Sequence, residues 1–399
     1  MPHVVQTETL VAEGVLSAEQ AKIIADRSRE TMLSLLVNIV LTAGIIAASL
    51  GFVFWIADAV GVALLGLAFL AVGMTVLLKG DVLYRLLGHA GTLIGAGMLI
   101  AGAGFELVDK YPDAAGAVMT ILGAIATLAA AFAFVKGPAT ARFSTGAVVL
   151  MGLAMHITGS GILVQDFLGS GLPKVTFFLY TAFLIAGAGV ALNVRVVTAL
   201  AIVPFAQVLD TGTAYFHAAY VFYSPEPTLT ILQMALLIGA CVWVGMQQPE
   251  RINRHTGILA IMAAVVGNLS FLVASIFGDD IGLSFFRDSA PSYNDFDGDW
   301  EAYNEAYEAW RATFFHISEH VYSVVWAAIL VVGAWFAASR HLRGLFNASV
   351  TFLGIHAYTQ AFETFADEPM VYALGGLAAI PLAWGLWRLN RGMFGEFAT

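Results

Sequence analysis

The chain has 399 residues, of which 59% are hydrophobic and only 12% are charged, and its mean hydropathy is +0.82. This composition excludes a water-soluble globule and is typical of a protein that crosses a lipid bilayer many times. The formal net charge of -10 comes largely from loops expected outside the cell, and it excludes nucleic acid as an expected partner. A single cysteine, Cys241, excludes a disulfide within the chain.

The first 31 residues differ from the rest of the chain because they are polar and amphipathic. Ser17 and Gln20 have the spacing of a capping box, in which each side chain accepts the other residue's backbone N–H at a helix start. We expect residues 1–31 to be a cytoplasmic amphipathic helical segment, either a membrane-surface anchor or a docking element for a regulatory partner. The segment contains no apolar core, so no cleavable signal peptide is expected.

A helix that crosses a bilayer needs about 20 mostly apolar residues. On this criterion, residues 32–277 contain spans one to nine, and residues 316–399 contain spans ten to twelve with a short cytoplasmic tail. The expected fold is an all-α polytopic bundle of about twelve transmembrane helices. The predicted spans are roughly 34–57, 59–78, 86–106, 114–135, 144–165, 175–193, 196–216, 227–246, 256–277, 316–338, 345–364 and 369–387.

The positions of lysine and arginine predict the orientation of these spans. All but four of the 18 basic residues fall in the two terminal segments and in the even-numbered loops. The four exceptions are Lys110, Lys174, Arg287 and Arg311. Because basic residues favour the cytoplasmic side, both termini are expected to be cytoplasmic, and a bacterial inner membrane is the expected location.

Two glycine-rich spans in the first half resemble each other. Residues 98–109 and 155–166 align at an offset of 57 positions. The matched pairs are Met98/Met155, Ile100/Ile157, Gly102/Gly159, Gly104/Gly161 and Asp109/Asp166. A helical hairpin repeated head to tail would produce this pattern, as would convergence of helices whose glycines allow close packing in lipid.

Span seven carries two ionisable residues, Asp210 and His217. If the span is one continuous helix, they are two turns apart and share a face. A carboxylate inside a membrane is costly unless it faces water, a cation or a hydrogen-bond donor. Asp210 and His217 are therefore candidates for a transport route or proton relay, with an ordinary interhelical hydrogen bond as the alternative.

Residues 278–315 form the one long external segment. Nine of its residues are acidic: Asp279, Asp280, Asp288, Asp295, Asp297, Asp299, Glu301, Glu305 and Glu308. We expect a solvated acidic loop. The run from Asp295 to Asp299 has some features of a calcium loop, but Tyr293 and Asn304 occupy two of the positions where such a loop needs a ligand.

An amphipathic helix is predicted at the end of this segment. Aromatic residues recur at three- and four-residue steps at Trp300, Tyr303, Tyr307, Trp310 and Phe314. Aromatic rings favour the membrane–water boundary, so this helix is expected to be an interfacial anchor, or alternatively a lid over a cavity. The whole segment 278–315 is also the expected docking surface for a partner in a membrane complex.

Span ten is predicted to begin with His316, Glu319 and His320, which share one face if the segment is helical. Two histidines one turn apart suit zinc, with a third ligand from His356, Glu363 or Asp210 and with Glu319 as general base. The same groups suit a proton relay, because histidine titrates near neutral pH. They would also serve simply as polar groups that close the rim of the bundle.

These patterns favour a secondary transporter or channel-like protein with an outward-facing His/carboxylate cavity. Its route for a small solute or proton would involve Asp210, His217, Glu319, His356 and Glu363. One alternative is a membrane-embedded enzyme whose zinc is held by His316 and His320. Another is a non-catalytic subunit or scaffold of a larger membrane complex. No catalytic residue is assigned and no Walker motif is present, so an enzyme is the less favoured class.

Both ends of the chain resemble a known family. Residues 10–21 (LVAEGVLSAEQA) are similar to the start of bacterial membrane proteins grouped as domain of unknown function 2157. The C-terminal pattern that looks like the same group comprises His356-Ala357-Tyr358, Phe362-Glu363-Thr364-Phe365, Gly375-Gly376-Leu377 and Arg388-Leu389-Asn390-Arg391. The resemblance implies a multi-pass membrane protein and supplies no catalytic residue.

Overall fold

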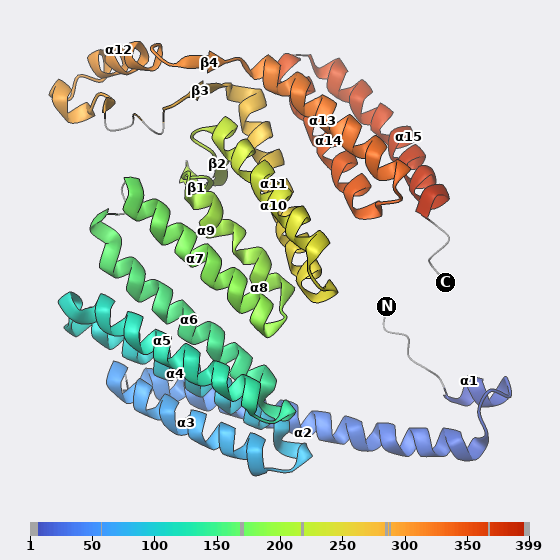
Figure 1. Cartoon of the computed structure of the whole chain (residues 1–399). Coiled ribbons are helices and arrows are strands. Elements are labelled where there is room, and N and C mark those ends of the chain that lie inside the picture. The colour runs from blue at the N-terminus through green and yellow to red at the C-terminus, as the bar shows by residue number, and fades with distance from the viewer. Residues whose placement is uncertain are drawn as a thin grey trace. The chain divides into compact units, whose positions relative to one another are not determined.

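The computed structural model describes residues 7–56, 58–167, 171–216, 219–283, 286, 289–365 and 368–394. The described residues are 85% helical, and two short antiparallel two-stranded sheets are the only sheets among them (Figure 1). It divides into two compact units, Met1–Phe177 and Phe178–Thr399, and the division falls within helix α7 (Gly171–Leu192). The prediction of an all-α helical membrane protein is confirmed at this level.

Nine helices among the described residues are long and apolar enough to cross a membrane. They coincide with nine of the twelve predicted spans, and the exceptions are 196–216, 345–364 and 369–387. Helices α14 (Arg343–Thr364) and α15 (Pro369–Phe394) occupy the last two of these ranges, but neither is among the nine. A total of twelve spans and the orientation of the termini therefore stay predictions.

The predicted span 196–216 is wrong as a single helix. The chain there forms α8 (Arg195–Leu200) and α9 (Ile202–Gln207), and then strand β1 (Gly212–Phe216). Pro204 lies in the first turn of α9, where a missing backbone N–H leaves no hydrogen bond unmade, so the proline favours a new helix start. Asp210 then adopts a left-handed φ of 58°, which turns the chain into the strand.

The first unit consists of helices in sequence-adjacent pairs. The capping box at the start of α2 is confirmed, because the Ser17 N–H donates to Gln20 Oε1 (3.0 Å) and the Gln20 N–H donates to Ser17 Oγ (3.1 Å). Helix α3 packs along α4, and α5 packs along α6. The helices of this unit are α1 (Thr7–Ala12), α2 (Ala18–Ile56), α3 (Ala59–Lys79), α4 (Arg85–Lys110), α5 (Pro112–Lys136) and α6 (Arg142–Val164).

The first unit contains two helical hairpins, α3–α4 and α5–α6, and the two helices of each hairpin cross at equivalent points. A Cβ added to Gly95 would lie 2.2 Å from the backbone nitrogen of Leu70, and one added to Gly152 would lie 2.7 Å from that of Thr127. Gly95 and Gly152 are 57 positions apart, and so are Leu70 and Thr127, which is the offset of the sequence match. The short 3-10 turns before α4 and α6, Val82–Tyr84 and Ala139–Ala141, keep that offset too. The structure thus favours duplication of a hairpin over convergence of glycine-rich helices.

Gly95→Val is expected to destabilise the first unit, because the crossing leaves no room for a side chain. Overpacking of this kind costs about 1–3 kcal/mol or more. Gly97→Val is the matched control, since nothing lies within 4 Å of a Cβ at Gly97 on the same helix. Thermal unfolding in detergent should show a lower Tm for Gly95→Val alone. Equal Tm values for the two variants would contradict this close crossing.

The second unit is built on a hairpin of α10 (Pro227–Gln247) and α11 (Glu250–Phe277). Helix α13 (Glu319–Ser339) packs against α11 and pairs with α14. Its core includes Met234 and Ala263, which contact residues of α9. The remaining elements of this unit are β1, β2 (Ala219–Tyr223), β3 (Asp279–Ile281), a 3-10 turn at Tyr293–Phe296, α12 (Trp300–Arg311) and β4 (Phe315–Ile317).

Candidate functional site

A small two-stranded antiparallel sheet at one end of α11 and α13 places two aspartates on opposite faces of the chain. Strand β3 pairs antiparallel with β4, so that Asp279 lies opposite Ile317 and Asp280 lies opposite His316. Gly278 ends α11 with a φ of 67°, and a Cβ there would lie 2.8 Å from the His316 ring. Because side chains alternate along a strand, the neighbouring carboxylates have different surroundings.

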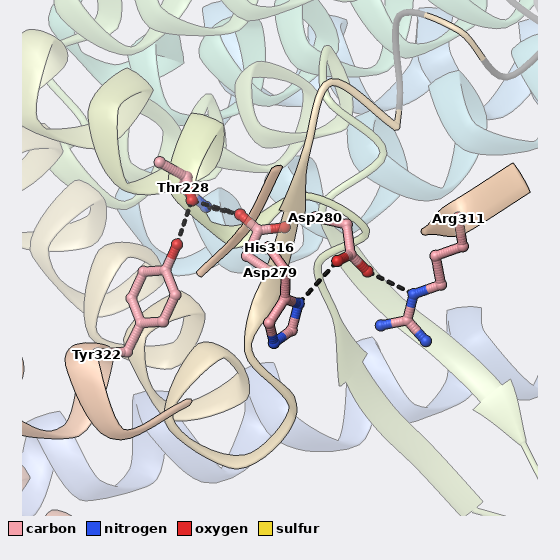
Figure 2. Close-up of polar contacts among 6 residues, drawn as sticks. All are labelled: Thr228, Asp279, Asp280, Arg311, His316 and Tyr322. Carbon is pink, nitrogen blue, oxygen red and sulfur yellow. Dashed lines mark hydrogen bonds and ion pairs between the residues drawn. The ribbon is translucent and has the colours of Figure 1, made fainter. Parts of the chain in front are cut away.

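The side chains of Arg311 and His316 hold the Asp280 carboxylate. Its carboxylate forms an ion pair with Arg311 Nε from α12 and lies 2.7 Å from His316 Nδ1 (Figure 2). The Asp280 side chain is only 6% exposed. The hydrogen bond to Asp280 raises the pKa of the Arg311 guanidinium, so the arginine remains charged. The Arg311–Asp280 ion pair therefore ties the last turn of α12 to the β3–β4 sheet.

Among the described residues, no cationic side chain pairs with the Asp279 carboxylate. Its Oδ2 accepts the backbone N–H of Thr228 at 2.8 Å and also the Thr228 hydroxyl, which in turn lies 2.5 Å from the Tyr322 hydroxyl (Figure 2). The residue is 3% exposed, and its Oδ1 has no hydrogen-bond partner among the described residues. Burial raises the pKa of this carboxyl, and the nearby Glu226 adds to the effect, although the Thr228 bonds oppose it.

A second buried carboxylate, that of Glu226, lies next to the end of β3. Glu226 is 1% exposed and accepts the backbone N–H of Gly282 just after β3. Close to it in sequence, the hydroxyl of Thr230 lies 2.6 Å from that of Thr211 and 3.1 Å from that of Ser224. The start of α10 therefore presents a polar, largely buried surface to the segment that carries Asp279.

A cavity of about 750 Å³ opens beside the two aspartates. Its wall includes Asp279, Asp280 and Arg311 together with the aromatic residues Phe277 and Tyr307. A smaller hollow of about 440 Å³ continues along α12 and shares Tyr223, Pro225, Leu283 and Tyr307 with the first. These volumes are typical of pockets that bind small molecules.

The predicted aromatic helix is confirmed as α12. The Asp299 side chain caps it by accepting the N–H groups of Glu301 and Ala302. Its rings contact one another along one face, and Trp310 lies 4.9 Å from Phe314, centroid to centroid. Tyr307 and Trp310 line the cavities, so this face of α12 forms part of their wall.

The predicted helical arrangement of His316, Glu319 and His320 is wrong. His316 lies in strand β4 and contacts Asp280, because the helix begins only at Glu319, where Ser318 Oγ accepts the His320 N–H at 3.2 Å. The His320 side chain is 85% exposed, with Nε2 3.6 Å from Glu319 Oε1. Within the described ranges, no group of three His, Cys, Asp or Glu side chains is placed to hold a metal ion.

The other predicted residues are dispersed. His356 is buried in α14, where its ring lies 4.9 Å from that of Trp326 and its Nδ1 has no partner in the part of the chain described. Glu363 is exposed near the end of α14, and Asp210 lies in the turn before β1. His217 lies outside the described residues. The described cavity wall contains none of His356, Glu363 and Asp210.

Sequence reasoning missed Thr228, Tyr322 and Glu226, and it treated Asp279 as one of many loop acids. One available signal was the sequence Gly278-Asp279-Asp280 directly after a span, where a glycine ends the helix and the first acid falls close to the membrane. Contacts between Thr228 and residues 51 and 94 positions away leave no periodic pattern in the sequence.

Comparison with protein-family models, with curated proteins and with solved structures gives no match for this chain. The resemblance of its two ends to domain of unknown function 2157 therefore stays an expectation.

Proposed function

We propose that this chain is a secondary transporter or channel-like membrane protein that takes a small organic cation into the cavity beside Asp279. The observation that carries the proposal is that Asp279, whose buried Oδ1 has no hydrogen-bond partner among the described residues, is one of the residues that line a cavity of about 750 Å³. A buried carboxylate oxygen without a partner is unfavourable, and a cation or a hydrogen-bond donor would stabilise it.

The charges around the cavity favour a cationic solute over an anionic one. Arg311 is the one lysine or arginine on the described wall, and Asp280 already pairs with it. This leaves the second aspartate, Asp279, to meet the solute. An arriving anion would face that carboxylate without a free cation to offset the repulsion.

The aromatic wall favours an organic cation over a bare metal ion. Four aromatic residues line the cavity: Phe222, Tyr223, Phe277 and Tyr307. An alkylammonium group can contact a carboxylate and the faces of aromatic rings at once, and such cation–π contacts contribute about 0.5–2 kcal/mol. Because residues 278–315 are expected outside the cell, the cavity would take its solute from the outer side.

The test is equilibrium binding of choline and tetraethylammonium to the full chain purified in detergent. Removing the charge by Asp279→Asn should weaken binding at least ~10-fold, since truncating a buried charge contact costs about 2–5 kcal/mol. The neutral carbon isostere of choline should bind weakly. Asp295→Asn is the matched control, because Asp295 is an exposed carboxylate in the same segment, and it should bind like the unmodified chain.

Two results would overturn the proposal. One is equal affinity of Asp279→Asn and the unmodified protein for these cations. The other is failure of both cations to bind the folded protein at millimolar concentration. Equal binding of the neutral isostere would show that the cavity recognises shape alone and would remove the role assigned to the carboxylate.

A further inference from the structure

We propose that Asp279, Thr228 and Tyr322 form a proton relay, so that a cation entering the cavity displaces a proton from the Asp279 carboxyl. This inference rests on the proposed cation site and adds the coupling ion. It assigns no new ligand to the cavity. Figure 2 shows the three residues left of its centre, where dashed lines join Thr228 to Asp279 and to Tyr322.

The hydrogen-bond directions support a relay. When Asp279 is ionised it can only accept, so the Thr228 hydroxyl donates to Oδ2 and must then accept from the Tyr322 hydroxyl. Thr228 has one hydroxyl hydrogen, which fixes the direction of the whole chain. If Oδ2 carries the proton, both hydroxyls can rotate and the chain runs the other way. The same heavy-atom positions thus accommodate both charge states.

The surroundings favour a proton on the empty site. Burial raises the pKa of Asp279, and Glu226 acts in the same direction. The backbone N–H of Asp280 acts in the opposite direction by hydrogen bonding to the carboxylate. Of the other ionisable groups that face this region, Arg311 and His316 are engaged with the Asp280 side chain, and Tyr322 is reached through Thr228. No cation is therefore paired with Asp279 among the described residues until a solute supplies one.

The exchange is balanced in protons and charge. The O–H bond of the neutral carboxyl breaks, its electron pair stays on the carboxylate oxygen, and the proton passes to solvent directly or by way of the Thr228 and Tyr322 hydroxyls. The positive charge of the incoming cation replaces that of the departing proton. Binding should then release a proton and strengthen as the pH rises through the titration of Asp279.

The experiment measures the proton directly with dicyclohexylcarbodiimide, which reacts with protonated carboxyl groups in apolar surroundings. The acid O–H adds across one C=N bond, so that the proton goes to nitrogen and the oxygen bonds to the central carbon. The adduct rearranges to a stable N-acylurea without loss of atoms. Mass spectrometry of the intact full-length protein, followed by peptide mapping, locates the label.

We expect label on Asp279, falling about tenfold for each pH unit above its titration midpoint, and reduced when choline is present. Asp280 is the internal control in the same peptide, because its carboxylate is engaged by Arg311 and we expect no label there. Thr228→Val removes a donor to the ionised form, so labelling should persist to higher pH. Tyr322→Phe should shift the profile in the same direction by a smaller amount.

The outcomes separate this inference from the proposed function. Choline binding with no label on Asp279, or with label that does not vary with pH, overturns the relay and leaves the cation site. Label that falls with pH but is unaffected by choline, in protein that does not bind choline, supports a titrating Asp279 and overturns both the cation site and the exchange. Label on Glu226 in place of Asp279 overturns the assignment of the proton. A Thr228→Val profile identical to that of the unmodified chain removes Thr228 from the relay.

Discussion

Trp326→Ala is expected to lower the free energy of unfolding by about 3–5 kcal/mol, the usual effect of deleting a fully buried tryptophan. Trp326 is 0% exposed and lies where α11, α13 and α14 meet. Its Nε1 donates to Asn268 Oδ1 at 2.8 Å, its ring stacks on Phe271, and its centroid lies 4.9 Å from that of the His356 ring. Removing it leaves a cavity and an unpaired amide oxygen together.

Two variants separate these contributions. Trp335→Ala is the matched control, because Trp335 lies on the same helix with 71% of its surface exposed and should leave stability almost unchanged. Trp326→Phe keeps most of the ring and removes the N–H, so it should cost about 0.6 kcal/mol, the average for an interhelical hydrogen bond in a membrane protein. Reversible unfolding in mixed micelles measures the free energy of unfolding of Trp326→Ala, Trp335→Ala and Trp326→Phe. A Trp326→Ala protein as stable as Trp335→Ala would contradict this packing.

Arg311→Met is the second large change, because it leaves the Asp280 carboxylate without its ion pair. Asp280 is 6% exposed, whereas the arginine side chain is 39% exposed, so solvent will compensate in part. We expect Arg311→Met to lower the free energy of unfolding by about 1–3 kcal/mol, with the effect concentrated in the β3–β4 sheet and α12. Hydrogen exchange of the amides at 279–281 and 300–311 should therefore accelerate more than exchange elsewhere.

The double variant Arg311→Met/Asp280→Asn tests the cause. Neutralising the aspartate removes the unpaired buried charge, so the double variant should recover part of the protection lost in Arg311→Met. Arg254→Met is a suitable control, because Arg254 and Glu250 form an exposed pair at 3.9 Å, and such pairs contribute about 0–1 kcal/mol. If hydrogen exchange of these amides is unchanged in Arg311→Met, the ion pair does not hold α12 to the β3–β4 sheet.

Hydropathy was sufficient to locate nine long helices, because a bilayer imposes length and composition on each segment separately. It failed at 196–216, where Pro204 and the turn at Asp210 divide an apolar run whose average hydropathy is unaffected by the break. The 57-residue offset between the two glycine-rich spans was visible in the sequence, and the close glycine crossings give a packing reason for the match.

The site was harder to predict than the helices. Helical spacing joined His316 to His320, but the Ser318 cap begins the helix after His316 and leaves that residue in a strand. The hydrogen bonds around Asp279 instead join Thr228 at the start of α10 to Asp279 after α11 and to Tyr322 in α13. Such contacts depend on how hairpins pack, and a single sequence carries no local pattern for them.

The most direct test of a transport function at Asp279 is choline counterflow in liposomes that contain the purified full-length chain. We predict that labelled choline accumulates in liposomes preloaded with unlabelled choline, and that Asp279→Asn reduces the initial rate at least ~10-fold while Asp295→Asn does not. Equal rates for the unmodified protein, for Asp279→Asn and for protein-free liposomes would contradict this function.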